Sequence, residues 1–367
     1  VYGFEFFLFY RTYDTSRHLE KIADQLGITS DTRSRFEVIE ARRKKRGDTN
    51  VFPMHGFDSV IDGILPLGTY PNAEIVYCNE AGYFSTFDSD RHGFRNNDAL
   101  WDQEVDLVVL GDSFGQGACL NDGEDIGSYI SAEIPGMINL SRGGSGVVHH
   151  LASFIEYGRY LRPRYVVWMH YEGNDLASLA VYDDDIIGQS YQTDPSFQQG
   201  LMGRSQEIRK KMVDFFERKA KGPPKKINAW SRILGIGGVE RRRLVKSVLM
   251  LTRLRSTFGL VKEKGNDIRW DSFKTYFSRI NAEVEATKAK LIFVNIPPTG
   301  RPIQKTSVAA KTEQIVLDAG VAFIDAGELA HKSFTDPADL FMWGRNGGHF
   351  SHVGAKVVAQ AITGFIK

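Results

Sequence analysis

The sequence has only two cysteines, Cys78 and Cys119, in 367 residues. It contains no Cys-X-X-Cys pair and no cluster of cysteine with histidine, which excludes the common zinc-binding patterns. Two cysteines are compatible with free buried thiols or with one disulfide, and the sequence leaves both open. If they pair, the bond ties the N-terminal part of the chain to the segment around Cys119.

The sequence also lacks a hydrophobic run long enough to cross a bilayer, which takes about 20 apolar residues. The first ten residues, VYGFEFFLFY, are aromatic and apolar, and Arg11 follows them directly. They predict either the trimmed end of a membrane anchor or signal segment, or an N-terminal helix that packs on the core. The first alternative places the protein in the periplasm or another extracytoplasmic compartment, anchored by its N-terminus.

Net charge is nearly absent, at +1, but the charges are unevenly distributed. Residues 204–264 hold 18 Lys and Arg against 5 Asp and Glu. Such an excess is typical of a solvated helix face, and it also suits contact with anionic lipid headgroups or an acidic polysaccharide. No recognised nucleic-acid motif accompanies it, so we expect no nucleic-acid partner.

Phosphate-binding motifs are missing as well. The glycine-rich stretch GQGACL lacks the third glycine of the dinucleotide fingerprint, and no GK[ST] follows it. We therefore expect no cofactor and no metal ion.

Five short apolar runs predict strands, and helical stretches lie between and after them. The alternation predicts a parallel sheet with helices on both faces, in which ligands bind beyond the carboxyl ends of the strands. The expected strands are 105–110, 136–140, 165–171, 290–296 and 321–325. The expected helices are 123–133, 146–161, 268–288, 305–319 and 352–366.

The chain divides into two expected parts. Residues 1–103 form an N-terminal accessory segment of a charged helix followed by short strands. Residues 104–367 form the α/β domain, which a basic, mostly helical insertion interrupts at about 176–266.

Polar residues suited to acyl transfer follow the predicted strands. Ser113 comes directly after the first strand and before a probable helix, where its hydroxyl would be exposed. A serine hydroxyl needs a base within hydrogen-bond reach and donors for the developing oxyanion. Gly144 and Asn174 follow the second and third strands, and His349 precedes the last helix. Each residue alone is common turn chemistry, but their order and their placement at strand ends favour a site.

These four blocks resemble the SGNH hydrolase family, also called the GDSL family. The blocks are GDSFGQG, NLSRGG, EGND and HFSHVG, within residues 104–175 and 289–367. The resemblance implies a flavodoxin-like, three-layer α/β/α fold with a central five-stranded parallel sheet. It implies that Ser113 is the nucleophile and His349 the general base. It also implies an oxyanion hole made by the backbone N–H groups of Ser113 and Gly144 and the side chain of Asn174.

One position departs from the family pattern. The family usually has an aspartate three residues before the histidine, and this sequence has Asn346 there. Asparagine cannot stabilise an imidazolium as a carboxylate does. Three alternatives follow: a Ser–His dyad with a carbonyl orienting the ring, another acid such as Asp336 or Asp339, or a slow or inactive protein. His352 is a rival base, but we expect it on the surface of the following helix.

The resemblance predicts a serine-dependent esterase or acyltransferase that acts on O-acyl groups, foremost O-acetyl groups. Its substrate would be an acylated glycan or a small ester, because the insertion and the N-terminal segment resemble bacterial envelope members that add or remove acetyl groups on polysaccharides. Two alternatives stay open. Asn346 favours a catalytically decayed protein that binds a glycan or acts as a scaffold. The basic stretch 204–264 favours a lipase at a membrane surface.

Overall fold

The computed structural model describes residues 27, 31–54, 60–176, 179, 186–221, 268–300 and 302–367. Residues 26–213 and 269–367 form one compact unit. The first ten residues and most of the basic insertion lie outside the described residues, so the hypotheses about them stay hypotheses. Within the described part of the chain, no helix combines the length and the apolar composition that a membrane crossing needs.

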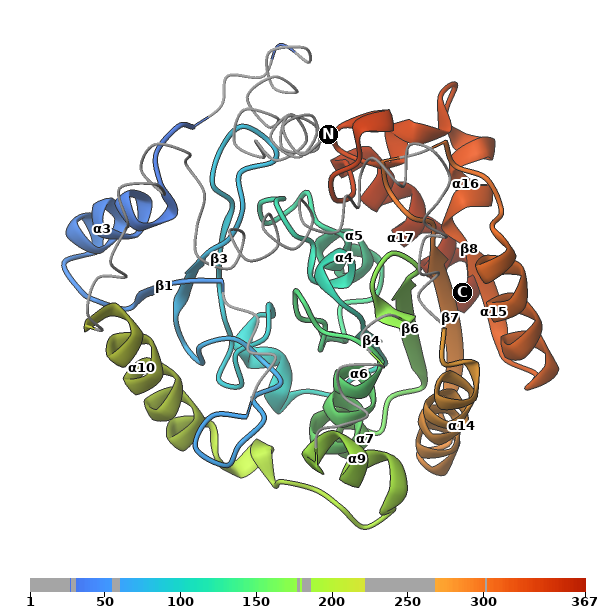
Figure 1. The fold of residues 1–367 in the computed structure, drawn as a ribbon, viewed down its shortest axis with the longest axis horizontal. Coiled ribbons are helices and arrows are strands. Elements are labelled where there is room, and N and C mark those ends of the chain that lie inside the picture. The colour runs from blue at the N-terminus through green and yellow to red at the C-terminus, as the bar shows by residue number, and fades with distance from the viewer. Residues whose placement is uncertain are drawn as a thin grey trace, which may run out of the picture. The chain divides into compact units, whose positions relative to one another are not determined.

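The centre of this unit is a five-stranded sheet in the order β5-β4-β6-β7-β8, with all neighbours parallel. Helices cover both of its faces (Figure 1). The expected three-layer α/β/α architecture is therefore confirmed, and each strand falls inside a predicted apolar run. The strands are β4 (Leu107–Leu110), β5 (Met137–Asn139), β6 (Tyr165–Tyr171), β7 (Lys290–Ile296) and β8 (Ala322–Asp325).

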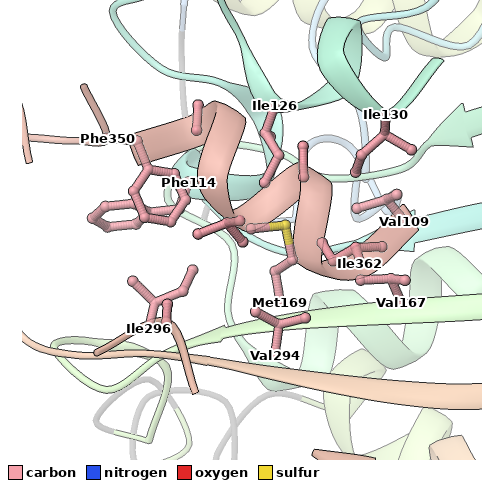
Figure 2. Close-up of a cluster of buried hydrophobic side chains, with 14 of the residues drawn as sticks. Val109, Phe114, Ile126, Ile130, Val167, Met169, Val294, Ile296, Phe350 and Ile362 are labelled. Carbon is pink, nitrogen blue, oxygen red and sulfur yellow. The ribbon is translucent and has the colours of Figure 1, made fainter. Parts of the chain in front are cut away.

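One face of the sheet packs against α5 (Ile126–Glu133) and α17 (His352–Ile366). Alternate strand residues point into this layer, as the two-residue period of a strand requires. Figure 2 shows the resulting apolar cluster, in which Phe114 packs with Phe350 and Ile126. Because Phe114 directly follows Ser113, the core itself anchors the turn that carries the serine.

The opposite face packs against α6 (Val147–Ser153) and α14 (Trp270–Ala286). Trp168 of β6 is fully buried there, and its ring stacks on Phe277 with centroids 6.0 Å apart. Its indole Nε1–H donates to His150 Nδ1 at 2.9 Å, so the one polar atom of the side chain is satisfied.

The accessory segment forms a smaller sheet of β1 (Val51–Pro53), β2 (Glu74–Val76) and β3 (Thr86–Asp88). β1 is parallel to β2, and β2 is antiparallel to β3. The charged helix expected before it is α3 (Arg35–Arg46), which begins at a capping box between Ser34 and Glu37. The connection between β2 and β3, residues 77–85, proves important for the site.

Among the α-helices of the described residues, α16 (Ala326–Ser333) was not predicted. It follows β8 without a loop, because Asp325 ends the strand and also caps the helix, accepting from the Gly327 N–H at 2.7 Å. The other described helices are α4 (Ser113–Gln116), α7 (Arg159–Leu161), α9 (Ile186–Thr193), α10 (Ser205–Lys221) and α15 (Ser307–Asp318), with the 3₁₀ turns η1 (Asp98–Asp102), η3 (Leu201–Gly203), η4 (Pro337–Leu340) and η5 (Gly344–Asn346) and the π-helical turn η2 (Phe154–Gly158).

Candidate active site

Ser113 is the first residue of α4, a single helical turn directly after β4. Asp112 caps this turn, because its Oδ1 accepts from the Phe114 N–H at 2.9 Å. Gly111 lies against Met169 and Ser141, where an added Cβ would be only 3.1 Å from the Met169 Cβ. Ser113 lies at the carboxyl edge of the sheet, as predicted from the sequence, but the tight turn leaves it half-buried where the sequence predicted an exposed hydroxyl.

His349 lies in the loop between η5 and α17 and faces Ser113. Its Nε2 is 3.0 Å from the Ser113 Oγ, which is hydrogen-bond distance between a nucleophile and its base. Phe114 packs against the imidazole ring with centroids 5.1 Å apart. His352, the rival base, begins α17 and is exposed, as expected. The structure therefore brings together two of the predicted residues, which are 236 positions apart in the chain.

Glu80 supplies the carboxylate that the sequence analysis did not find. Its Oε1 and Oε2 both lie 3.0 Å from His349 Nδ1. Oε2 also accepts from the His349 backbone N–H at 2.8 Å, so the carboxylate is fixed at two points. Glu80 lies in the connection between β2 and β3 of the accessory sheet, and therefore outside the five-stranded sheet and the helices that cover it. Ser113, His349 and Glu80 form one hydrogen-bonded chain.

The acids proposed from the sequence are not the carboxylate that contacts His349 Nδ1. Asp336 caps η4 and pairs with Arg345 at 3.0 Å, and Asp339 is exposed. Asn346 is exposed at the end of η5. The expectation that Asp336, Asp339 or a carbonyl orients the ring is thus wrong. It failed because the carboxylate comes from 269 residues before His349, where no local spacing points to it.

The pairing of the two cysteines is a sequence signal from which the position of Glu80 could have been predicted. They form a disulfide, Cys78–Cys119, which settles the alternative left open by the sequence. Cys78 is two residues before Glu80, and Cys119 is six residues after Ser113. A pairing of these cysteines therefore predicts that the segment carrying Glu80 lies beside the serine turn.

The ionisation of the pair follows from this contact. Burial by itself lowers the pKa of the His349 imidazole, but the hydrogen bond and the charge of Glu80 outweigh it and raise that pKa above its ordinary value. Burial would raise the pKa of the Glu80 carboxyl, and the hydrogen bond and charge of His349 outweigh that effect and lower it. The site thus favours a charged carboxylate beside a histidine that readily takes a proton.

Glu80, Cys119 and His349 offer ligand atoms within 4.8 Å of one another, a spacing that suits a metal ion. In the disulfide, however, the Cys119 sulfur is not a thiolate and makes a poor ligand. Its Sγ lies 3.8 Å from His349 Nδ1. With two ligands left, both engaged with each other, the oxidised cluster fits an orienting carboxylate and a base better than a metal site.

The residues predicted to bind the oxyanion lie at the ends of neighbouring strands. Gly144 follows β5 and Asn174 follows β6, on either side of β4, which leads into Ser113. Both are exposed, and Gly144 has a φ of +76°, which favours glycine. The backbone N–H of the neighbouring Gly143 is already used, because it donates to Gln116 Oε1 at 2.8 Å.

The chain resembles GDSL-like lipases and acylhydrolases. A GDSL-like lipase from Bacteroides thetaiotaomicron is 12% identical, over 72% of this chain and 89% of its own, with a TM-score of 0.38. A lipase/acylhydrolase from Enterococcus faecalis is 13% identical, over 71% and 95%, with a TM-score of 0.38. A catalytic mutant of an acetylxylan esterase from Geobacillus stearothermophilus is 12% identical, over 71% and 94%, with a TM-score of 0.35.

No protein-family model and no curated protein matches the sequence. At the identities and TM-scores of these solved structures, the likeness does not establish an activity. The chemistry of this chain therefore rests on its own Ser113, His349 and Glu80.

Proposed function

We propose that this protein is a serine-dependent esterase or acyltransferase acting on O-acyl groups, foremost O-acetyl groups, of a glycan. The observation that carries the proposal is the hydrogen-bonded chain from the Ser113 hydroxyl through His349 to Glu80. A nucleophile, a base and a carboxylate in this order activate serine for attack on a carbonyl in several unrelated folds.

In the proposed reaction, Ser113 Oγ attacks the ester carbonyl while His349 Nε2 takes the hydroxyl proton. His349 Nδ1–H donates to Glu80 throughout, so the carboxylate holds the tautomer and stabilises the imidazolium that forms. The imidazolium then protonates the leaving alkoxide. Water or a sugar hydroxyl attacks the acyl-enzyme and gives its proton to His349. His349 then returns this proton to the Ser113 Oγ as the acid or the new ester leaves.

We assign the oxyanion to the backbone N–H groups of Ser113 and Gly144 and the side-chain amide of Asn174. Their support is their position: they follow three adjacent strands of the sheet, and Gly144 and Asn174 are exposed to an incoming ligand. Neutral donors at such an edge stabilise charge that develops on a carbonyl oxygen.

The glycan substrate and the location are further parts of the proposal. The glycan follows from the resemblance of the sequence to envelope members of the SGNH family. A periplasmic or other extracytoplasmic location is supported by the Cys78–Cys119 disulfide, because such bonds persist in oxidising compartments. An N-terminal membrane anchor, and contact of residues 204–264 with anionic lipid or acidic polysaccharide, belong to the same proposal.

The alternative of a catalytically decayed protein rested on Asn346, which left His349 without an acid. Glu80 supplies that acid, so this observation no longer favours decay.

The test is turnover of p-nitrophenyl acetate, butyrate and octanoate by wild type, Ser113→Ala and His349→Ala. We expect each substitution to lower kcat more than about 10³-fold, because a triad acts as a unit. His352→Ala is the matched control, since this exposed histidine begins α17 and should leave turnover unchanged.

The outcomes separate the candidate functions. Preference for acetate, with release of acetate from an acetylated polysaccharide, supports the glycan esterase, and preference for octanoate supports the lipase. No turnover of any ester, together with no labelling of Ser113 by a fluorophosphonate, would overturn the proposal and leave a binding or scaffold protein.

A further inference from the structure

The carboxylate of the site and its other two members belong to different sheets. Ser113 and His349 lie at the edge of the five-stranded sheet, while Glu80 lies in the connection between β2 and β3 of the accessory sheet. The hydrogen bonds from His349 to Glu80 thus form only when the β2–β3 connection lies against the serine turn. What holds this connection in place decides whether the site is complete.

Non-covalent contacts also hold the connection. The Asp31 N–H donates to the Gly82 carbonyl at 2.8 Å, the Tyr77 N–H donates to the Ser85 carbonyl at 2.9 Å, and the Tyr77 side chain is buried. Trp343 Nε1–H donates to the Glu80 carbonyl at 3.0 Å, and the Tyr83 hydroxyl donates to Glu124 at 3.0 Å. Asn79 Nδ2 donates to the Asp31 carbonyl at 3.2 Å. Partly solvated hydrogen bonds of this kind each contribute about 1 kcal/mol.

The covalent contact is the Cys78–Cys119 disulfide, whose two ends differ. Cys119 is fully buried, and the guanidinium of Arg95 holds its loop by donating to the carbonyls of Gly117 at 2.8 Å and Leu120 at 3.1 Å. Cys78 is half-buried in the connection that carries Glu80. The bond therefore joins the segment that carries Glu80 to the loop that Arg95 holds, and its Cys78 end is two residues from the carboxylate.

We propose that the Cys78–Cys119 disulfide is the positioning device of the site: it holds Glu80 against His349, and its reduction converts the three-residue site into a Ser113–His349 dyad. A dithiol reductant supplies two electrons and two protons, the S–S bond breaks, and two thiols and the oxidised reductant result. The half-buried Cys78 gives the reductant access. This inference rests on the proposed function.

The test measures kcat/KM against pH for wild type, Glu80→Gln and Cys78→Ser/Cys119→Ser, each with and without dithiothreitol. EDTA is present throughout, because reduced Cys119 together with Glu80 and His349 would form a set of metal ligands. Mass spectrometry verifies reduction, circular dichroism verifies that the fold persists, and reoxidation tests reversibility. The double serine variant controls for effects of the reductant elsewhere.

We expect reduction to lower kcat/KM of wild type about 10-fold or more, reoxidation to restore it, and the double serine variant to match reduced wild type under both conditions. In Glu80→Gln, reduction should change kcat/KM less than about twofold, because the bond acts through the missing carboxylate. An equal loss in wild type and Glu80→Gln would mean a merely structural bond and would overturn the inference, as would full activity of reduced wild type.

A readout independent of turnover separates this inference from the proposed function. The titration midpoint of the His349 imidazole, followed by NMR, should fall on reduction of wild type and stay unchanged on reduction of Glu80→Gln. If no ester is turned over but the midpoint falls as expected, the function is wrong and the positioning role stands. If esters are turned over but the midpoint does not move, only the positioning role is wrong.

Discussion

At the scale of single residues, the site depends on how one carboxylate changes one imidazole. Burial lowers the pKa of His349, but the hydrogen bond and charge of Glu80, together with the charge of Asp112, raise it above its ordinary value. A base must be neutral to take the Ser113 proton, so activity rises as pH increases through the pKa of His349. Because the pKa of His349 is raised, we expect activity to rise at a pH above the ordinary pKa of histidine.

Glu80→Gln should move this rise in activity to lower pH, because the variant loses the two largest effects that raise the pKa of His349, and the lowering effect of burial remains. It should also lower kcat by about 10²- to 10⁴-fold, since the amide no longer stabilises the imidazolium. The pH dependence of kcat/KM checks both effects. Asp336→Asn is the matched control and should leave the profile unchanged, because Asp336 pairs with Arg345 instead. A profile of Glu80→Gln that coincides with wild type would contradict the assigned role.

A second titratable group lies under the serine turn. Asp112 is fully buried, and burial, with the nearby Asp175 carboxyl, raises its pKa to about 7. The folded state thus holds a proton that the unfolded chain loses near pH 4. Between these values the unfolded state binds fewer protons, so this group makes stability fall as pH rises.

Asp112→Asn should remove this dependence while keeping the side-chain acceptor for the Phe114 N–H. We expect the variant to gain stability relative to wild type on going from pH 5 to pH 8. Urea unfolding at the two pH values measures the difference. Asp106→Asn, at a half-exposed side chain beside Arg164, serves as the control and should show no such trend. A constant difference between Asp112→Asn and wild type would refute the buried titration.

At the scale of elements, Arg95 joins the accessory segment to the turn that carries Ser113. Its side chain is only 6% exposed and pairs with Asp122 at 2.7 Å and Asp125 at 3.3 Å. The same guanidinium donates to carbonyls at the end of α4. Its planar fork of donors suits several acceptors at once, which lysine could not serve.

Arg95→Met should lower the free energy of unfolding by about 3 kcal/mol, because the buried Asp125 carboxylate loses its charged partner and the Gly117 and Leu120 carbonyls lose a donor. Urea denaturation measures the loss. Arg91→Met is the control: this arginine pairs with the half-exposed Asp98 and the exposed Asp102, so its loss should change stability little. An equal loss of stability in Arg95→Met and Arg91→Met would mean that the buried contacts of Arg95 contribute no more than exposed ion pairs.

At the scale of the whole molecule, the compact unit contains two sheets, and one disulfide links the segments that follow β2 and β4. The Cys78–Cys119 bond links residues 41 apart, so it closes a long loop in the unfolded chain. Restricting such a loop lowers the entropy of the unfolded state and thereby stabilises the fold.

Reduction should therefore lower the free energy of unfolding by about 3–4 kcal/mol for a loop of this length. Urea denaturation with and without a phosphine reductant measures the change. The Cys78→Ser/Cys119→Ser variant should resemble reduced wild type and show no response to the reductant. A wild type whose unfolding ignores the reductant, after complete reduction has been verified, would contradict this role.

The sequence by itself determined the layers and two members of the site. Runs of 5 to 7 mostly apolar residues between helical stretches predicted β4 to β8, because a strand that is buried on both faces is apolar along its length. Ser113 and His349 were predictable because each lies in a short block next to a strand end or a helix start.

Only the tertiary structure showed which residue supplies the carboxylate that contacts His349. Glu80 is 269 residues from His349 and lies in a connection of another sheet, so neither periodicity nor spacing relates the two. Their contact depends on how the β2–β3 connection meets the serine turn, which the Cys78–Cys119 bond and the hydrogen bonds around it fix. Packing between two sheets brings this carboxylate to its base. The residues next to His349 in the sequence therefore do not indicate which carboxylate it contacts.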